Sequence, residues 1–118
     1  MKAKKVSSQK LMKMVQASIR RFGEFIELER PIILKFSNAK TYYGKYETEL
    51  IVADTVEFCH IITVSCYHNG EQSIVDSTIA HEMVHAKQIE TGNEADHGES
   101  FQHWREEIRA YFHLDIEE

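Results

Sequence analysis

His81-Glu82-Met83-Val84-His85 is an H-E-x-x-H array inside a segment whose apolar residues recur at helical spacing. In an α-helix of about 3.6 residues per turn, side chains four positions apart project from one face. Two such imidazoles can share one tetrahedral zinc ion, and Glu82 then lies where it can take a proton from a zinc-bound water. The array is therefore typical of a zinc peptidase. The alternative is a pair of exposed histidines on a solvated helix.

A third metal ligand is expected further along the chain, because catalytic zinc keeps three protein ligands and an open position. The longer pattern, with a glycine three residues and a histidine six residues after the second histidine, is excluded because Gln88 and Thr91 occupy those positions. His97 is the best candidate, and Glu94 is the alternative that a carboxylate-type site would use. His103 is predicted to be a surface or partly buried histidine.

His97 stands between a polar loop and a second predicted helix. The loop, residues 91–96, contains a glycine and can turn the chain back toward the motif helix. Asp96 and Glu99 resemble a capping pair for the helix that follows. That helix would bury one apolar stripe, formed by Phe101, Trp104, Ile108 and Phe112. A ligand at the start of such a packed helix would be held rigidly.

Two short motifs follow one another in this region. His81–Ala86 reads H-E-M-V-H-A, and His97–Phe101 reads H-G-E-S-F, with Trp104 shortly after it. This pair resembles the SprT-like (Spartan-type) metalloprotease domain, which shows the same two motifs in the same order. The resemblance covers roughly residues 74–104, and the ordered pair is far more specific than either motif alone.

The resemblance implies one Zn²⁺ per chain, held by His81, His85 and His97, with Glu82 as the catalytic acid/base. It implies a zinc endopeptidase whose substrate is protein or peptide, and the family includes a protease that degrades proteins crosslinked to DNA. Many relatives continue into a cysteine-rich zinc ribbon or long DNA-binding regions, whereas this chain ends about fourteen residues after Trp104. We therefore expect residues 1–118 to form a single SprT-like domain without a zinc ribbon.

The composition agrees with a globular domain of modest core. The chain has 118 residues, of which 42% are hydrophobic, and lacks the long apolar run of a membrane span or secretory signal. Cys59 and Cys66 are expected to be reduced cysteines in a strand region, although His60 and His68 nearby make a second metal site conceivable. A cytoplasmic or nucleoid-associated location is expected, with no membrane partner.

Charge is unevenly distributed along the chain. Residues 1–40 carry ten Lys and Arg against three Glu, whereas residues 41–118 carry four against sixteen Asp and Glu. A basic N-terminal third can contact nucleic acid phosphates, and the residues expected to do so are Lys4, Lys5, Lys10 and Lys13. Because the remainder is acidic, we expect such DNA binding to be weak and non-specific. The alternative is a solvated helix face.

The scaffold is predicted to be α+β and zincin-like. An N-terminal helix capped by Ser7 or Ser8 should run to about Leu28, before Arg30-Pro31. Strands are predicted at residues 31–36, 41–46, 49–53 and 56–67, which form a small sheet of three or four strands. Ser73 and Asp76 can cap the motif helix, which should end near residues 91–92. The helix that carries the third ligand completes the fold.

Substrate binding is assigned to the segment around Tyr42, Tyr43 and Tyr46, where a strand edge beside the cleft can hold an extended peptide. The group that stabilises the oxyanion is not identified: His103, Tyr111 and these three tyrosines are the candidates. Two other functions remain open, a nucleic-acid-associated adaptor that keeps zinc only as structure, and a zinc hydrolase of another substrate class. The carboxylate of Glu82 favours an enzyme, because a purely structural site has no use for it.

Overall fold

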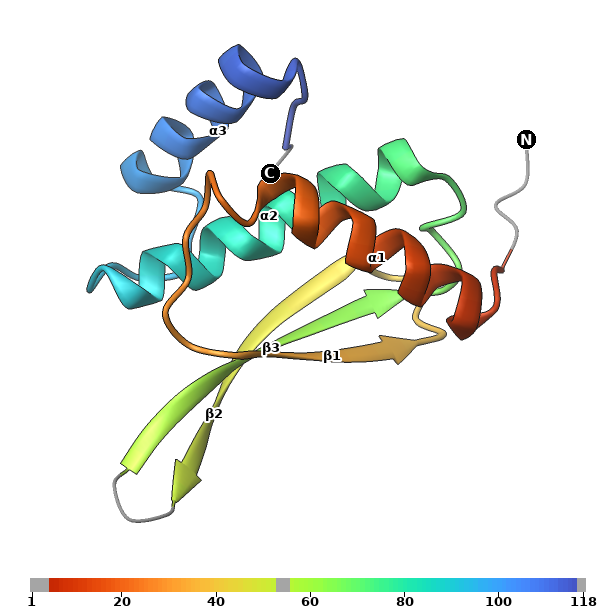
Figure 1. The fold of residues 1–118 in the computed structure, drawn as a ribbon, viewed down its shortest axis with the longest axis horizontal. Helices are drawn as coiled ribbons and strands as arrows, with labels where there is room; N and C mark the ends of the chain where they lie inside the picture. The colour runs from red at the N-terminus through yellow and green to blue at the C-terminus, as the bar shows by residue number, and fades with distance from the viewer. Residues whose placement is uncertain (1–4, 53–55, 117–118) are drawn as a thin grey trace.

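The computed structural model describes residues 5–52 and 56–116. Within these residues the chain forms three helices and three strands (Figure 1). Their bounds are α1 Ser8–Phe22, β1 Ile32–Ser37, β2 Gly44–Val52, β3 Val56–Ser65, α2 Gln72–Glu90 and α3 Glu99–Phe112. The protein is therefore α+β, as the sequence predicts. In the described ranges, every helix is too short or too polar to cross a membrane.

The sheet has the strand order β1-β3-β2, with β1 parallel and β2 antiparallel to the central strand β3. β1 pairs with β3 only from His60 onward, so the far part of the β2–β3 hairpin projects from the body as a two-stranded ribbon (Figure 1). The segments predicted separately at residues 41–46 and 49–53 contribute to one strand that begins at Gly44. The sheet therefore has three strands in the described chain, and β2 forms one of its edges.

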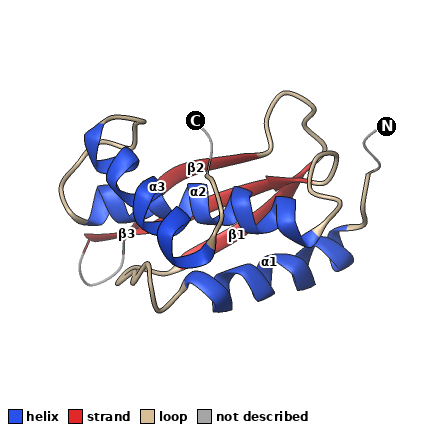
Figure 2. Ribbon diagram, turned by 90° about the horizontal axis from the view of Figure 1, so that it is seen from above, coloured by secondary structure: helices blue, strands red, loops and turns tan. Residues whose placement is uncertain are grey.

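The helices build two further layers on one face of this sheet. α1 and α2 lie side by side against the sheet, and α3 lies on the far side of α2 (Figures 1 and 2). Their apolar stripes meet in one core, which includes Leu11, Val15, Phe22, Ile62, Val64, Val75, Ile79, Met83, Phe101 and Ile108. Each such side chain contributes about 1.5–3 kcal/mol when it is fully buried. α2 is consequently packed from both sides, which fixes the helix that carries the motif.

α1 ends at Phe22, six residues before the predicted end at Leu28. Ser7 caps its start as predicted, since the Ser7 hydroxyl accepts a hydrogen bond from the Lys10 backbone N–H. The Gly23 N–H still donates to the Ile19 carbonyl oxygen, and a Cβ at Gly23 would lie 2.8 Å from that oxygen. The chain then turns and places Phe25 against the α3 residues Trp104 and Phe112. Tertiary packing of Phe25 therefore overrides the continuing helical spacing.

The start of α2 also differs from the prediction. The helix begins at Gln72, and Glu71 occupies the cap position without a side-chain hydrogen bond, so the capping roles predicted for Ser73 and Asp76 were wrong. Asp76 is instead buried against α1, where its carboxylate accepts hydrogen bonds from the Ser18 hydroxyl and the Arg21 guanidinium, both at 2.6 Å. A buried carboxylate with a charged partner joins the two helices.

A candidate metal centre

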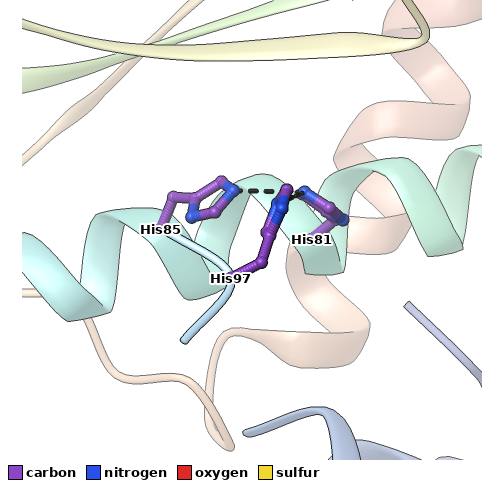
Figure 3. Close-up of side chains that lie close together, drawn as sticks. All are labelled: His81, His85 and His97. Carbon is purple, nitrogen blue, oxygen red and sulfur yellow. Dashed lines mark hydrogen bonds between the residues drawn. The ribbon is translucent and has the colours of Figure 1, made fainter. Parts of the chain in front are cut away.

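Three histidines, two from a helix and one from the segment that follows it, meet in one cluster (Figure 3). His81 and His85 project from α2, and His97 comes from the segment that precedes α3. The Nε2 atom of His81 lies 3.1 Å from that of His85 and 3.2 Å from that of His97. The four-residue spacing on α2 and the return of the chain after residue 91 therefore bring together the three predicted ligands.

Two of the three separations between these nitrogens are close to those of a tetrahedral metal site, and all three donor atoms lie within 4.8 Å of one another. With metal–nitrogen bonds of about 2.0–2.1 Å, two ligand nitrogens of a tetrahedral site are about 3.3 Å apart. Each imidazole nitrogen has one lone pair or one proton in the ring plane, so His81 Nε2 cannot make two well-directed hydrogen bonds to both neighbours. A cation held between the three rings would accept a lone pair from each of them. Burial lowers the pKa of His85, which favours the neutral form that a metal ligand needs.

The alternative ligands lie elsewhere. Among the described residues, His81, His85 and His97 are the one group of metal-ligating side chains whose donor atoms converge. Glu94 is exposed in the loop, and His103 is exposed on α3 with its ring against Trp104. Cys59 and Cys66 are buried free cysteines and belong to no such group in the described chain. The geometry therefore favours His97 over Glu94 as the third donor.

Glu82 follows His81 on α2 and lies close to Gly44, the first residue of strand β2. Its side chain is 6% exposed, and burial raises the pKa of the carboxyl to about 8. The strand comes very close at Gly44, where a Cβ would lie 2.7 Å from Thr78 Cγ2 and 3.2 Å from Glu82 Oε2. Glycine at this position therefore leaves the space in which the carboxylate sits, between the motif helix and the edge strand.

A cavity of about 570 Å³ opens next to His81 and Glu82. The cavity is lined by Tyr42 and Tyr43, by residues in the first half of α2 and by Asp115. Tyr42 donates a hydrogen bond to the Ser37 hydroxyl, whereas the exposed ring of Tyr43 stacks on His68. Two of the three tyrosines assigned to substrate binding thus line the cavity.

Tyr46 points in another direction. Its hydroxyl lies 2.6 Å from His60 Nδ1, and His60 in turn contacts the Glu90 carboxylate at the end of α2. Burial, together with the negative charge of Glu90, raises the pKa of the Tyr46 hydroxyl to about 12. This buried chain of contacts fastens β2 and β3 to the end of the motif helix.

The segment after α3 completes one side of the cavity. The Ser77 hydroxyl donates to the Asp115 carbonyl oxygen at 2.9 Å, and Arg105 makes two hydrogen bonds to the Asp115 carboxylate. These bonds from Arg105 hold the pKa of Asp115 at about 2. No sequence pattern identifies Asp115, because its position at the cavity depends on how the chain returns after α3.

Residues around the histidines include two further differences from the predictions. Gly98, not Asp96, is the cap of α3, and it makes no side-chain cap bond; Asp96 Oδ1 accepts from the Gly98 N–H instead. Gln88 is buried with its Oε1 2.8 Å from His85 Nδ1, a contact that sequence reasoning missed. Its spacing of three residues from His85 on a helix was the available signal.

The basic residues of the N-terminal third lie apart from this cluster. Lys5, Lys10 and Lys13 are exposed, whereas Lys4 lies outside the described residues. Lys10 and Lys13 line a groove of about 870 Å³ along the first turns of α1, together with Phe36 of β1. Positive charge and one aromatic ring therefore occur together on this surface.

An α+β fold with three converging histidines and a neighbouring buried glutamate defines a protein with a candidate metal centre. A model of the SprT-like family matches residues 14–118, so the chain belongs to the SprT-like family. The matched range contains the whole cluster and both motifs. The comparisons with curated proteins and with solved structures gave no match to the chain.

Proposed function

We propose that the protein is a zinc-dependent metallopeptidase with a zincin-like site. The observation that carries this proposal is the convergence of the Nε2 atoms of His81, His85 and His97 next to the buried carboxylate of Glu82. Catalytic zinc keeps three protein ligands, often histidines, and an open fourth position. Membership of the SprT-like family supports the same assignment.

In the proposed hydrolysis, the three histidines and Glu82 have different roles. Zinc, when bound by the three histidines, supplies a Lewis acid that activates a water molecule and polarises the scissile carbonyl. Glu82 accepts the proton of the attacking water and then delivers it to the leaving amine. Burial raises the pKa of Glu82, so the carboxylate is a stronger base than an exposed glutamate. With a divalent cation held by the three histidines, the pKa of the Glu82 carboxyl would fall again, so that Glu82 would be ionised and able to accept the proton.

The substrate is proposed to be an extended segment of protein. β2 is an edge strand of the sheet, and it passes directly over Glu82 at Gly44. A peptide that pairs with this edge would bring its backbone to the catalytic carboxylate. The cavity walls at Tyr42 and Tyr43 then provide contacts for its side chains.

The test is hydrolysis of casein and of a histone by zinc-loaded protein, with Glu82→Gln as the matched control. Cleavage of either protein by the wild type and its loss in the control support the proposal. Zinc binding without hydrolysis would instead indicate an adaptor that keeps the metal only as structure. Hydrolysis of a small ester but not of proteins would indicate a different substrate class.

Weak DNA binding is proposed for the groove that contains Lys10, Lys13 and Phe36, because cations and an aromatic ring are what a single strand contacts. Affinity is expected in the range of roughly 10⁻⁴ to 10⁻⁶ M and should fall steeply with salt, since phosphate contacts dominate non-specific binding. Fluorescence anisotropy with a short single strand tests this, comparing Lys10→Gln/Lys13→Gln with Lys35→Gln. Absence of binding at low salt would leave the groove a solvated surface.

A further inference from the structure

Gln88 is a buried polar side chain for which the proposed reaction has no direct use. It lies on α2 and is 1% exposed. Its Oε1 atom is 2.8 Å from His85 Nδ1. Its Nε2 atom donates one hydrogen bond to the Asp96 carbonyl oxygen at 3.0 Å and one to the Ser100 hydroxyl at 2.7 Å. Both amide protons are therefore used, as a buried amide requires.

The chemistry of these partners fixes which way the amide faces. The Asp96 carbonyl oxygen can only accept a hydrogen bond, so the NH₂ end of Gln88 must face it. The carbonyl end of Gln88 then faces His85, and His85 must carry its proton on Nδ1. The lone pair of His85 is consequently on Nε2, the atom that points into the histidine cluster.

The NH₂ group of Gln88 bonds to residues on either side of the third histidine, His97. Asp96 immediately precedes His97, and Ser100 lies in the first turn of α3. The residues from 91 to 99 are exposed, so few side chains restrain the segment that carries His97. The two hydrogen bonds from the packed helix α2 therefore hold the backbone carbonyl that precedes this ligand and the Ser100 side chain that follows it.

We propose that Gln88 is a positioning residue that sets two metal ligands at once: its carbonyl fixes the tautomer and ring of His85, and its NH₂ group holds the segment that carries His97. This inference rests on the proposed metal site. Partners of metal-bound histidines that lie outside the coordination sphere typically contribute about 10–100-fold to metal affinity. Here one side chain performs this role for ligands on two different elements.

Three substitutions separate the two halves of this role. Gln88→Met removes both, and Gln88→Glu keeps an acceptor for His85 but replaces the donor toward Asp96 and Ser100 by a carboxylate oxygen. Ser100→Ala removes only the hydrogen bond between Gln88 Nε2 and the Ser100 hydroxyl. Gln16→Met, at an exposed position of α1, is the matched control. Zinc affinity is measured by competition with a chelator, the His85 tautomer by ¹⁵N NMR of metal-free protein at pH 8, and loop opening by hydrogen exchange.

Gln88→Met should weaken zinc binding about 10–100-fold, shift metal-free His85 toward the Nε2–H tautomer and speed exchange in residues 93–98. Gln88→Glu should speed the exchange but leave the tautomer unchanged, and a purely structural role would not separate these readouts. Folded Gln88→Met with wild-type affinity and tautomer overturns the inference and leaves the proposed function standing. If Gln88→Met does not fold, unchanged loop exchange in Gln88→Glu overturns the inference instead. Wild-type protein that binds no zinc overturns the proposed function and this inference together.

Discussion

The two parts of the histidine cluster are held in different ways. His85 is 8% exposed on a helix packed between the sheet and α3, whereas His97 is exposed in a segment without regular structure. The helical repeat alone places His81 and His85 on one face of α2. The position of His97 depends instead on a few polar contacts between that segment and α2. The site therefore combines a rigid half with a half that can be loosened separately.

The largest expected effect belongs to the rigid half. Glu82→Gln should lower peptide hydrolysis by about 10²–10⁴-fold, because an amide cannot accept the proton of the attacking water. The substitution should leave zinc binding and folding intact, since Glu82 is not one of the converging ligands. The measurement is kcat for a cleaved peptide alongside the zinc content of the same sample. Wild-type activity in a folded, zinc-loaded variant would exclude Glu82 as the base.

Removing one histidine from each half should distinguish the effect on zinc affinity from the effect on the stability of the metal-free protein. His97→Ala and His85→Ala should both weaken zinc binding by more than the roughly 10–100-fold typical of partners outside the coordination sphere. His85→Ala should also destabilise metal-free protein by about 1–3 kcal/mol, because it leaves Gln88 Oε1 buried without its partner. His97→Ala should leave that stability nearly unchanged, because its side chain is exposed.

Controls for this comparison are Glu94→Ala, the alternative ligand, and His103→Ala, an exposed histidine of α3. Neither should affect zinc binding. Loss of zinc in Glu94→Ala with retention in His97→Ala would assign the third ligand to the carboxylate and contradict the geometry described here. Chelator competition and chemical denaturation of metal-free protein measure the two quantities.

The same contrast explains how much of the molecule the sequence predicts. The apolar stripes of α2 and α3 and the four-residue spacing of the histidine pair are local patterns, and the structure agrees with them. The end of α1 could not be predicted, because Phe25 leaves the helical path to pack on α3. The role of Asp76 was misassigned for a similar reason: its partners Ser18 and Arg21 lie more than fifty residues away in sequence.

Within the candidate site, the residues of the histidine cluster could be predicted from the sequence, and the contacts that support them could not. H-E-x-x-H and H-G motifs are read from adjacent residues, so His81, Glu82, His85 and His97 could be proposed from the sequence. The second contact of Gln88 requires knowledge of where residues 96–100 return, and the proximity of Gly44 to Glu82 requires the packing of β2 on α2. Contacts between distant segments leave no periodic signal.

A smaller effect is expected from a methyl group at the edge strand. Gly44→Ala should lower hydrolysis about tenfold, a change that corresponds to about 1.4 kcal/mol, because the new Cβ would press on Thr78 Cγ2 and on the Glu82 carboxylate. Adding Thr78→Ser removes the closest atom and should restore part of the activity. Full activity in Gly44→Ala would show that strand β2 shifts to accommodate the methyl group. That result would contradict the description of this half of the site as rigid.

The smallest expected effect concerns a second segment without regular structure, the one after α3, whose Asp115 lines the cavity. Its Asp115 side chain is 37% exposed and is bonded to Arg105, which lowers the pKa of the carboxyl from 3.8 to about 2. A depressed pKa in the folded state means that the ion pair stabilises the protein fully above about pH 4 and that this contribution is lost as the pH falls toward 2. Because the pair is solvated, Asp115→Asn should lower the free energy of unfolding by no more than about 1 kcal/mol at pH 7, and by less in high salt.

Urea denaturation of wild type and Asp115→Asn across this pH range tests the prediction, with Glu106→Gln as an exposed control on α3. The difference in stability between wild type and Asp115→Asn should shrink as the pH falls. A difference that stays constant from neutral pH to pH 2 would mean that the substitution does not act through the charge of Asp115, because the backbone bond from Ser77 to the Asp115 carbonyl oxygen is present in both proteins.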